Sequence, residues 1–327
     1  MALLEDAFNL YLSRIELDDT RVARASQRFN AVKGVISTGL SKHFPGINVR
    51  QIGSFQRRTK IRPREDSDSL DVDALVVFGD VTGWVQAGTP GALNAGDYLS
   101  LVLDALSRDL TYQAMRPETD SPTVVLTYHD GFCMELAAGY RDLSGKYPRA
   151  GGPACYVIAN GHLNWKPADY DYDAEIISGA NQHPSVAGAL VPTIKLLKQY
   201  LRARGVPLSS FHIEILATLI LPARLAEWAA KGLKWGYKHA LAAFLSDAAV
   251  LLQSPVSLPG SYSPPVDSKL SPLDLANVRA WVAERAKVAW TLCEADNSPG
   301  MGGELASLDR WRTFIGDPFP SYFALST

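Results

Sequence analysis

Two carboxylates and an upstream glycine-serine pair are the residues of this 327-residue chain whose types and spacing best fit a chemical role. Asp71 and Asp73 open the apolar run Leu70 to Phe78, which is typical of a buried strand. Side chains alternate across a strand, so both carboxylates project from the same face. Adjacent carboxylates at the edge of a core repel each other unless a cation lies between them. The pair therefore predicts a metal site.

Oxygen ligands on one side, completed by substrate phosphates, suit Mg²⁺, with Mn²⁺ as a possible substitute. Two such ions about 3.5 to 4 Å apart can activate an attacking hydroxyl and stabilise the leaving oxygen. Gly53 and Ser54 fit the same chemistry, because a small residue lets backbone N–H groups approach a phosphate chain and the hydroxyl adds a donor. Without this pair, a solvated strand end would be the better interpretation of Asp71 and Asp73. Together the residues indicate phosphoryl or nucleotidyl transfer.

The segment between these motifs is strongly basic. It could bind phosphates, form a solvated face, or pair with the acids beside it, and its cations are Arg57, Arg58, Lys60, Arg62 and Arg64. An EF-hand starting at Asp66 is excluded, because Leu70 occupies the fifth position of the loop and no glycine follows it.

A hairpin is predicted downstream, with strands over 123–129 and 132–138 around the turn Asp130-Gly131. Its second strand carries Glu135 as a lone acid in an apolar segment. From the residues alone, Glu135 fits an edge-strand charge as well as a functional group.

The phrase GSFQRRTKIRP, followed by DVDALVVF, resembles the signature of the bacterial cyclic GMP-AMP synthase-like nucleotidyltransferases, the CD-NTases, whose catalytic domain is called SMODS. The resemblance implies an α+β fold with a polymerase-beta-like nucleotidyltransferase core, a mixed sheet and a helical C-terminal lobe. It implies that NTPs, ATP or GTP among them, are joined into a cyclic di- or trinucleotide. The product would act in antiphage defence on a separate effector that the enzyme does not bind directly.

The resemblance also implies roles for individual residues. Met134-Glu135-Leu136 matches the family's third acidic triplet, so Glu135 would be a metal ligand and help deprotonate the attacking ribose hydroxyl, although the family usually has Asp there. Lys198, and less closely Lys195, match the lysine that reaches the triphosphate or base. Ser209 to Glu214 resembles the segment that opens the next core helix, with Ser209 or Ser210 as N-cap. Glu214 and His212 are expected to be structural.

Two lobes are expected, a nucleotidyltransferase lobe over residues 1–165 and a helical lobe over residues 166–327 that closes the nucleotide cleft. Helical stripes occupy the first 45 residues, and in the family such a helix braces the lobes. The stripes comprise Leu4, Phe8, Tyr11 and Ile15, followed by Val22, Phe29, Val32, Ile36 and Leu40.

Irregular segments are expected between these elements. The glycine-rich stretch 79–97 is interpreted as a surface excursion or lid, 142–153 as a flexible connection, and the acids from Asp169 to Glu175 as a solvated turn. Residues 255–265 are expected to form a loop, and Ser271-Pro272 to begin a helix. The Gly300 to Gly303 stretch follows no strand, so it is a weak nucleotide-loop signal.

Composition limits the partners and the compartment. A net charge of -2 argues against a surface that grips long nucleic acid. The three cysteines are far apart and indicate neither a disulfide framework nor a zinc site, which fits a reducing cytoplasm. No apolar run reaches the length of a membrane span, so no membrane association is expected.

Two other functions remain open from the sequence. One is a linear, template-independent nucleotidyltransferase acting on an RNA end, which should need a basic groove. The other is a catalytically silent nucleotide-binding relative, which the Glu at position 135 favours. Base choice, ring size and linkage depend on the shape of the pocket.

Overall fold

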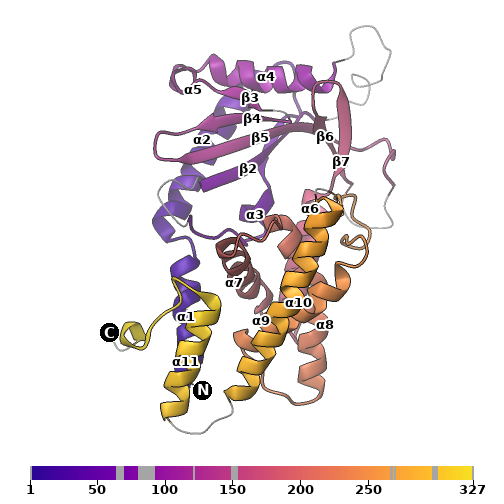
Figure 1. Ribbon diagram of the computed structural model, residues 1–327. Coiled ribbons are helices and arrows are strands. Elements are labelled where there is room, and N and C mark those ends of the chain that lie inside the picture. The colour runs from indigo at the N-terminus through magenta and orange to yellow at the C-terminus, as the bar shows by residue number, and fades with distance from the viewer. Residues whose placement is uncertain are drawn as a thin grey trace.

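The computed structural model describes residues 2–63, 70–79, 93–120, 122–148, 154–265, 268, 270–296 and 301–325. It has a sheet-containing lobe and a lobe made of helices, and the short helix α3 lies between the sheet and the helices (Figure 1). Arg64, the acids Asp66 and Asp68, most of the expected 79–97 excursion and Gly300 lie outside the described residues.

The sheet is mixed, in the order β1-β2-β5-β4-β3, with β6 pairing the end of β5 and β7 pairing β6. Strands β2 and β5 run parallel at its centre, whereas the other pairings are antiparallel. The strands of the sheet are β1 (Asn48–Gln51), β2 (Leu70–Val77), β3 (Glu118–Asp120), β4 (Thr123–Thr127), β5 (Phe132–Arg141), β6 (Tyr156–Asn160) and β7 (Asn164–Ala168).

One face of the sheet is covered by helices. Val72, Ala74 and Val76 of β2 share a core with α2 and α4, together with Met134 and Leu136 of β5. The opposite face is apolar only further along, where Leu75, Val77 and Ala137 form a small cluster with β6. Because strand side chains alternate, Asp71, Asp73 and Glu135 fall on this second face, which looks toward the helical lobe.

The remaining elements are helices. The described residues form α1 (Ala2–Ile15), α2 (Asp19–Leu40), α3 (Gly53–Gln56), α4 (Ala95–Ser107), α5 (Leu110–Met115), α6 (Tyr170–Gln182), α7 (Leu190–Ala203), α8 (Ser210–Ala230), α9 (Tyr237–Leu251), α10 (Pro272–Ala295), α11 (Met301–Ile315) and the short 3₁₀ helix Tyr322–Leu325. Within them, no helix is both long and apolar enough to cross a membrane.

The two N-terminal helices belong to different lobes. Phe8 of α1 is fully buried among aromatic rings of the helical lobe, with centroid distances of 5.7 Å to Trp311 and 5.1 Å to Phe319. Val32 of α2 is equally buried, but in the core of the sheet lobe. Figure 1 shows α1 beside α11 and α2 beside the sheet. The N-terminal segment therefore spans both lobes.

Most predicted elements are confirmed. Strand β2, the β4–β5 hairpin, the N-cap at Ser209 and the Ser271-Pro272 helix start all appear. Val22 is an exception to the predicted stripe, because its side chain lies on the solvent side of α2 at 41% exposure. Strand β7 ends at Ala168 and α6 begins at Tyr170, which is where the structure passes from sheet to helices.

Candidate active site

Parallel pairing of β2 with β5 brings the acidic side chains together. Asp73 is directly opposite Glu135 in the register, and Asp71 is opposite Cys133. Facing residues on neighbouring strands lie within side-chain reach, so the three predicted carboxylates lie together on one face of the sheet. Their spacing in sequence is 62 residues between Asp73 and Glu135, so this proximity is a product of strand pairing.

Gly53 is required by the approach of Asp73. Its φ of +70° lies in the left-handed region, which favours glycine. A Cβ at this position would lie 2.0 Å from Asp73 Oδ2 and 2.8 Å from Asp73 Cγ. The strand end β1 and the single turn of α3 therefore bring the backbone of Gly53 directly against the carboxylate, and Ser54 follows beside it.

A cavity of about 290 Å³, here called the basic cavity, lies between the carboxylates and the helical lobe. Its walls combine Asp71, Asp73 and Glu135 with Ser54, and with four cations contributed by the α3 loop and by α7. These cations are Arg57, Lys60, Lys198 and Arg202. Ser54 and Lys198, two of the predicted nucleotide-binding residues, thus line one cavity with all three predicted metal ligands.

Glu214 links the α3 loop to the helical lobe. This carboxylate on α8 is fully buried, and it accepts hydrogen bonds from Arg57 Nε at 2.5 Å and Lys198 Nζ at 2.6 Å. Lys198 also donates to Thr59 O at 3.0 Å and to Thr59 Oγ1 at 3.2 Å. An ammonium has three N–H groups, so these three acceptors satisfy Lys198 completely. We call Arg57, Thr59, Lys198 and Glu214 the interlobe network.

Burial and charge pairing act in opposite directions within this network. Burial lowers the pKa of Lys198 to about 8, although Glu214 opposes the change. Burial also penalises the charged form of Glu214, but Lys198 and Arg57 outweigh it and hold the pKa of that carboxyl below its usual range. The pair is therefore ionised at neutral pH, and the network carries a net positive charge beside the basic cavity.

A second cavity of about 380 Å³, here called the aromatic cavity, adjoins the basic cavity and shares Arg57 and Phe211 with it. Ile52, Tyr170 and Phe211 supply its apolar walls, and Thr123, Lys166 and Ser263 supply polar groups. Asp73 and Glu135 line both cavities. Molecules bound in the two cavities would therefore both be in contact with Asp73 and Glu135.

The expectation of a solvated turn over Asp169 to Glu175 is wrong. These residues begin α6, and Asp169 and Asp173 are buried at 1% and 2% exposure. Asp173 accepts hydrogen bonds from the hydroxyls of Ser261 and Ser263, and Asp169 accepts one from the backbone N–H of Tyr262. The acids hold part of the 255–265 loop against α6, where Ser263 closes the aromatic cavity.

The carboxylates are in an electrostatically unfavourable position without a cation. Burial raises the pKa of Asp73, and the charge of Asp71 adds to the rise. Burial and the charges of Asp73 and Asp71 likewise raise the pKa of Glu135. Among the described residues, no three His, Cys, Asp or Glu side chains are grouped closely enough to hold an ion as they stand. Three oxygen donors, two of them with raised pKa values, nevertheless fit a hard divalent cation, which would relieve their repulsion.

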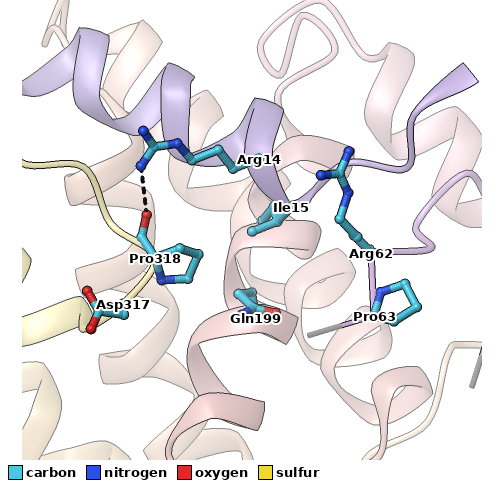
Figure 2. Close-up of a pocket in the computed structure, with 7 residues that line it drawn as sticks. All are labelled: Arg14, Ile15, Arg62, Pro63, Gln199, Asp317 and Pro318. Atoms are coloured by element: carbon cyan, nitrogen blue, oxygen red, sulfur yellow. Dashed lines mark hydrogen bonds between the residues drawn. The ribbon is translucent and has the colours of Figure 1, made fainter. Parts of the chain in front are cut away.

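Lys195 lies apart from the carboxylates. Its ammonium pairs with Glu16 just beyond the end of α1, and it lines neither the basic nor the aromatic cavity. A further pocket of about 320 Å³ opens between α1, α7 and the C-terminal segment, and it shares Pro63 with the basic cavity. Figure 2 shows Arg14 and Arg62 on opposite sides of this outer pocket, with Arg14 donating to Pro318 O. None of the predicted site residues lines it.

Two features of the site were not found from the sequence. Glu214 was expected to be structural, and its burial and ion pairs agree with that, but the sequence did not indicate that the two cations it joins line the basic cavity. The available signal was a carboxylate in an apolar helix, since a buried charge needs a partner. Phe211 was not singled out, although it lines both cavities, because an aromatic residue at a helix start is usually a packing residue.

Comparison with known proteins relates the N-terminal part of the chain to a family. The model of the Second Messenger Oligonucleotide or Dinucleotide Synthetase domain, SMODS, matches residues 1–147. A probable cyclic nucleotide synthase of Bacillus cereus strain VD146 is 22% identical over 305 residues, which cover 86% of this chain and 85% of the relative.

Solved structures share the whole fold. CdnC of E. coli MS115-1, solved with ATP, superposes with a TM-score of 0.65 at 14% identity, covering 97% of this chain and 99% of its own. The cyclic AMP-GMP synthase DncV of Vibrio cholerae, solved with the linear intermediate pppA(3',5')pG, gives 0.64 at 13% identity, with 97% of each chain covered. The CD-NTase CdnG of Bradyrhizobium diazoefficiens, solved with GTP, gives 0.60 at 16% identity, covering 96% and 99%. The predicted fold class, a nucleotidyltransferase core with a helical C-terminal lobe, is confirmed.

Proposed function

Because residues 1–147 match the SMODS domain, we propose that this chain is a metal-dependent nucleotidyltransferase that joins NTPs into a cyclic di- or trinucleotide and releases pyrophosphate. The observation that carries the proposal is the position of Asp73 and Glu135. They face each other on parallel strands and line both the basic and the aromatic cavity. A reaction between two nucleotides needs catalytic groups that can contact both of them.

Asp71, Asp73 and Glu135 are the residues that would hold Mg²⁺, or Mn²⁺ in its place. When bound, such ions supply a lowered pKa for the attacking hydroxyl and a counter-charge for the leaving pyrophosphate. The carboxylates have the oxygen chemistry that these ions prefer. Burial is the main cause of the raised pKa values of Asp73 and Glu135, and the neighbouring carboxylate charges add to it, so a bound cation would favour the ionised forms.

The chain's own groups would then act on the two nucleotides. The Ser54 hydroxyl donates to a phosphate oxygen, and the net positive interlobe network attracts the triphosphate to the basic cavity. The 2'- or 3'-hydroxyl oxygen of the second nucleotide bonds to the α-phosphorus, while the bond from that phosphorus to the bridging oxygen breaks. The hydroxyl proton passes to Glu135, the carboxylate that lies opposite Asp73 in the sheet.

ATP and GTP are the proposed substrates. Related structures support this choice, because CdnC was solved with ATP and CdnG with GTP, and DncV is named a cyclic AMP-GMP synthase. The aromatic cavity suits a nucleobase, since Tyr170 and Phe211 offer apolar ring surfaces beside the carboxylates. Signalling against phage is part of the proposal by resemblance, with an effector that is not bound directly.

The test is an incubation of the purified chain with labelled ATP, GTP, CTP and UTP and either Mg²⁺ or Mn²⁺, followed by phosphatase and mass spectrometry. The expected product is a phosphatase-resistant cyclic oligonucleotide. Asp71→Asn/Asp73→Asn should abolish it, and Glu135→Gln should reduce its rate by about 100-fold or more, since it removes a general base and a ligand. The same double variant tests the defence role by plaque counts in infected cells.

Other outcomes would assign the chain to its alternatives. Linear products would favour the transferase that extends RNA ends. Metal-dependent NTP binding without product, equal in wild type and Glu135→Gln, would favour the catalytically silent relative.

A further inference from the structure

Lys60 has an unusual position among the cations of the basic cavity. Its Nζ lies 3.9 Å from Asp71 Oδ2, which makes an ion pair but is too long for a hydrogen bond, and the side chain is 19% exposed. Burial lowers the pKa of Lys60, whereas Asp71, Asp73 and Glu135 all favour its charged form. The ammonium thus lies beside Asp71, in the cavity that Asp73 and Glu135 also line.

The other cations of this cavity hold shorter bonds elsewhere. Arg57 and Lys198 donate to Glu214 within 2.6 Å. Arg202 donates to Arg62 O at 3.2 Å and to Gln199 Oε1 at 3.0 Å. Moving any of these three groups would break a hydrogen bond, and for Arg57 or Lys198 it would leave the buried Glu214 poorly paired. Moving Lys60 breaks only the long ion pair with Asp71 among its described contacts.

We propose that Lys60 is a positioning residue that stands in for a divalent cation between Asp71, Asp73 and Glu135 in the free protein, and that turns to the phosphates of the incoming nucleotide when metal binds. The inference rests on the proposed function, because it needs a metal site at these carboxylates. A lysine suits the role, since its ammonium is a compact charge on a flexible four-carbon stem. Ser54, in the same cavity, would be its neighbour on the triphosphate.

If Lys60 moves from the carboxylates to the phosphates in this way, it should have opposite effects on metal binding and on nucleotide binding. The ammonium competes with metal for the carboxylates, so it weakens metal binding before the nucleotide arrives. Once the nucleotide is present, the same charge binds its phosphates and strengthens nucleotide binding. A residue that merely kept the cavity in shape would weaken both kinds of binding when replaced.

The first measurement is a titration of Mn²⁺ without nucleotide, followed by electron paramagnetic resonance of the free ion. Lys60→Met, which keeps the length of the stem, should bind Mn²⁺ about three- to tenfold more tightly than wild type, because a positive charge near the site has been removed. Lys60→Arg should stay within about twofold of wild type. Arg202→Met is the matched control, because it also removes a positive charge from the basic cavity. The Arg202 guanidinium is held by hydrogen bonds to Gln199 and Arg62, so its loss should change the Mn²⁺ affinity less than Lys60→Met does.

The second measurement is the affinity for a non-hydrolysable ATP analogue in saturating Mn²⁺, followed by fluorescence. Lys60→Met should weaken this affinity about tenfold, which is the loss of one charge-assisted hydrogen bond. Circular dichroism of each variant checks the fold, and Lys60→Gln repeats both titrations if Lys60→Met does not fold.

The outcomes separate this inference from the proposed function. Tighter Mn²⁺ binding with weaker nucleotide binding in Lys60→Met supports the exchange. Mn²⁺ binding by wild type that Lys60→Met leaves unchanged or weakens overturns it, while the metal site of the proposed function stands. Absence of Mn²⁺ binding in wild type, with or without nucleotide, overturns both.

Discussion

At the scale of single residues, the geometry of the site depends on Gly53 as much as on the carboxylates. The positive φ of Gly53 and the absence of a side chain let Asp73 Oδ2 occupy the place where a Cβ would be. Gly53 therefore allows the Asp73 carboxylate to take its position, in addition to any contact that Gly53 makes with phosphate.

Gly53→Ala tests this dependence. The new Cβ would meet Asp73 Oδ2 at 2.0 Å, so the carboxylate must move. A misplacement of about 1 Å can cost about 100-fold in rate, and we expect a loss of that size in product formation with the fold retained by circular dichroism. Gly179→Ala on α6 is the control, because a Cβ at that position would have nothing within 4 Å, and it should leave the rate unchanged. Full activity of Gly53→Ala would contradict the interpretation.

At the scale of elements, α3, α7 and α8 act together through the interlobe network. Thr59 and Arg57 follow α3, Lys198 lies on α7 and Glu214 on α8, and the bonds among them cross from the sheet lobe to the helical lobe. Helix α3, which carries Ser54, is thereby fixed to the helical lobe. A substitution in one lobe should therefore change the stability of the contacts in the other lobe.

A double-mutant cycle measures this coupling. Glu214→Gln should lower the free energy of unfolding by about 3 to 5 kcal/mol, because it leaves Arg57 and Lys198 buried without a counter-charge. Lys198→Met also destabilises, and the double variant should cost about 1 to 3 kcal/mol less than the sum. Urea unfolding gives these values. Glu227→Gln on the exposed surface of α8 is the control and should leave stability unchanged within error. Strict additivity would show that the two residues do not act as a unit.

At the scale of the whole molecule, the N-terminal helices connect the two lobes. Helix α1 completes the core of the helical lobe and α2 that of the sheet lobe, so residues close in sequence stabilise different cores. The backbone N–H of Arg62 donates to Ile15 O, which ties the basic loop to the end of α1. Lobe closure should therefore involve the short link between α1 and α2.

Hydrogen exchange can separate the two cores. Phe8→Ala removes a ring packed on Trp311 and Phe319, and should cost about 3 to 5 kcal/mol. We expect faster amide exchange in α9 and α11, with β2 and β5 nearly unchanged. Val32→Ala is the matched variant, and should speed exchange in the sheet lobe instead. Uniform acceleration in both lobes after either change would indicate one cooperative unit.

The sequence alone determined the local features that depend on neighbours along the chain. Alternation placed Asp71 and Asp73 on one face of β2, turn residues defined the β4–β5 hairpin, and Ser209 and Ser271 marked helix starts. Each of these follows from backbone periodicity or from a hydrogen bond within a few residues. The GSF motif and the Asp-x-Asp pair also carried the family resemblance over the part that SMODS matches.

The tertiary structure decided which charges meet. Parallel pairing of β2 with β5, set by a connection of more than 50 residues, put Glu135 opposite Asp73. Packing between the lobes buries Glu214 between Arg57 and Lys198. Lys195 pairs with Glu16 instead of lying near the carboxylates. Asp169 and Asp173 are buried. The sequence shows which residues are charged, but the partner of each charge depends on contacts between segments far apart in the chain. Those contacts placed the Lys60 ammonium beside Asp71, in the cavity that Asp73 and Glu135 also line.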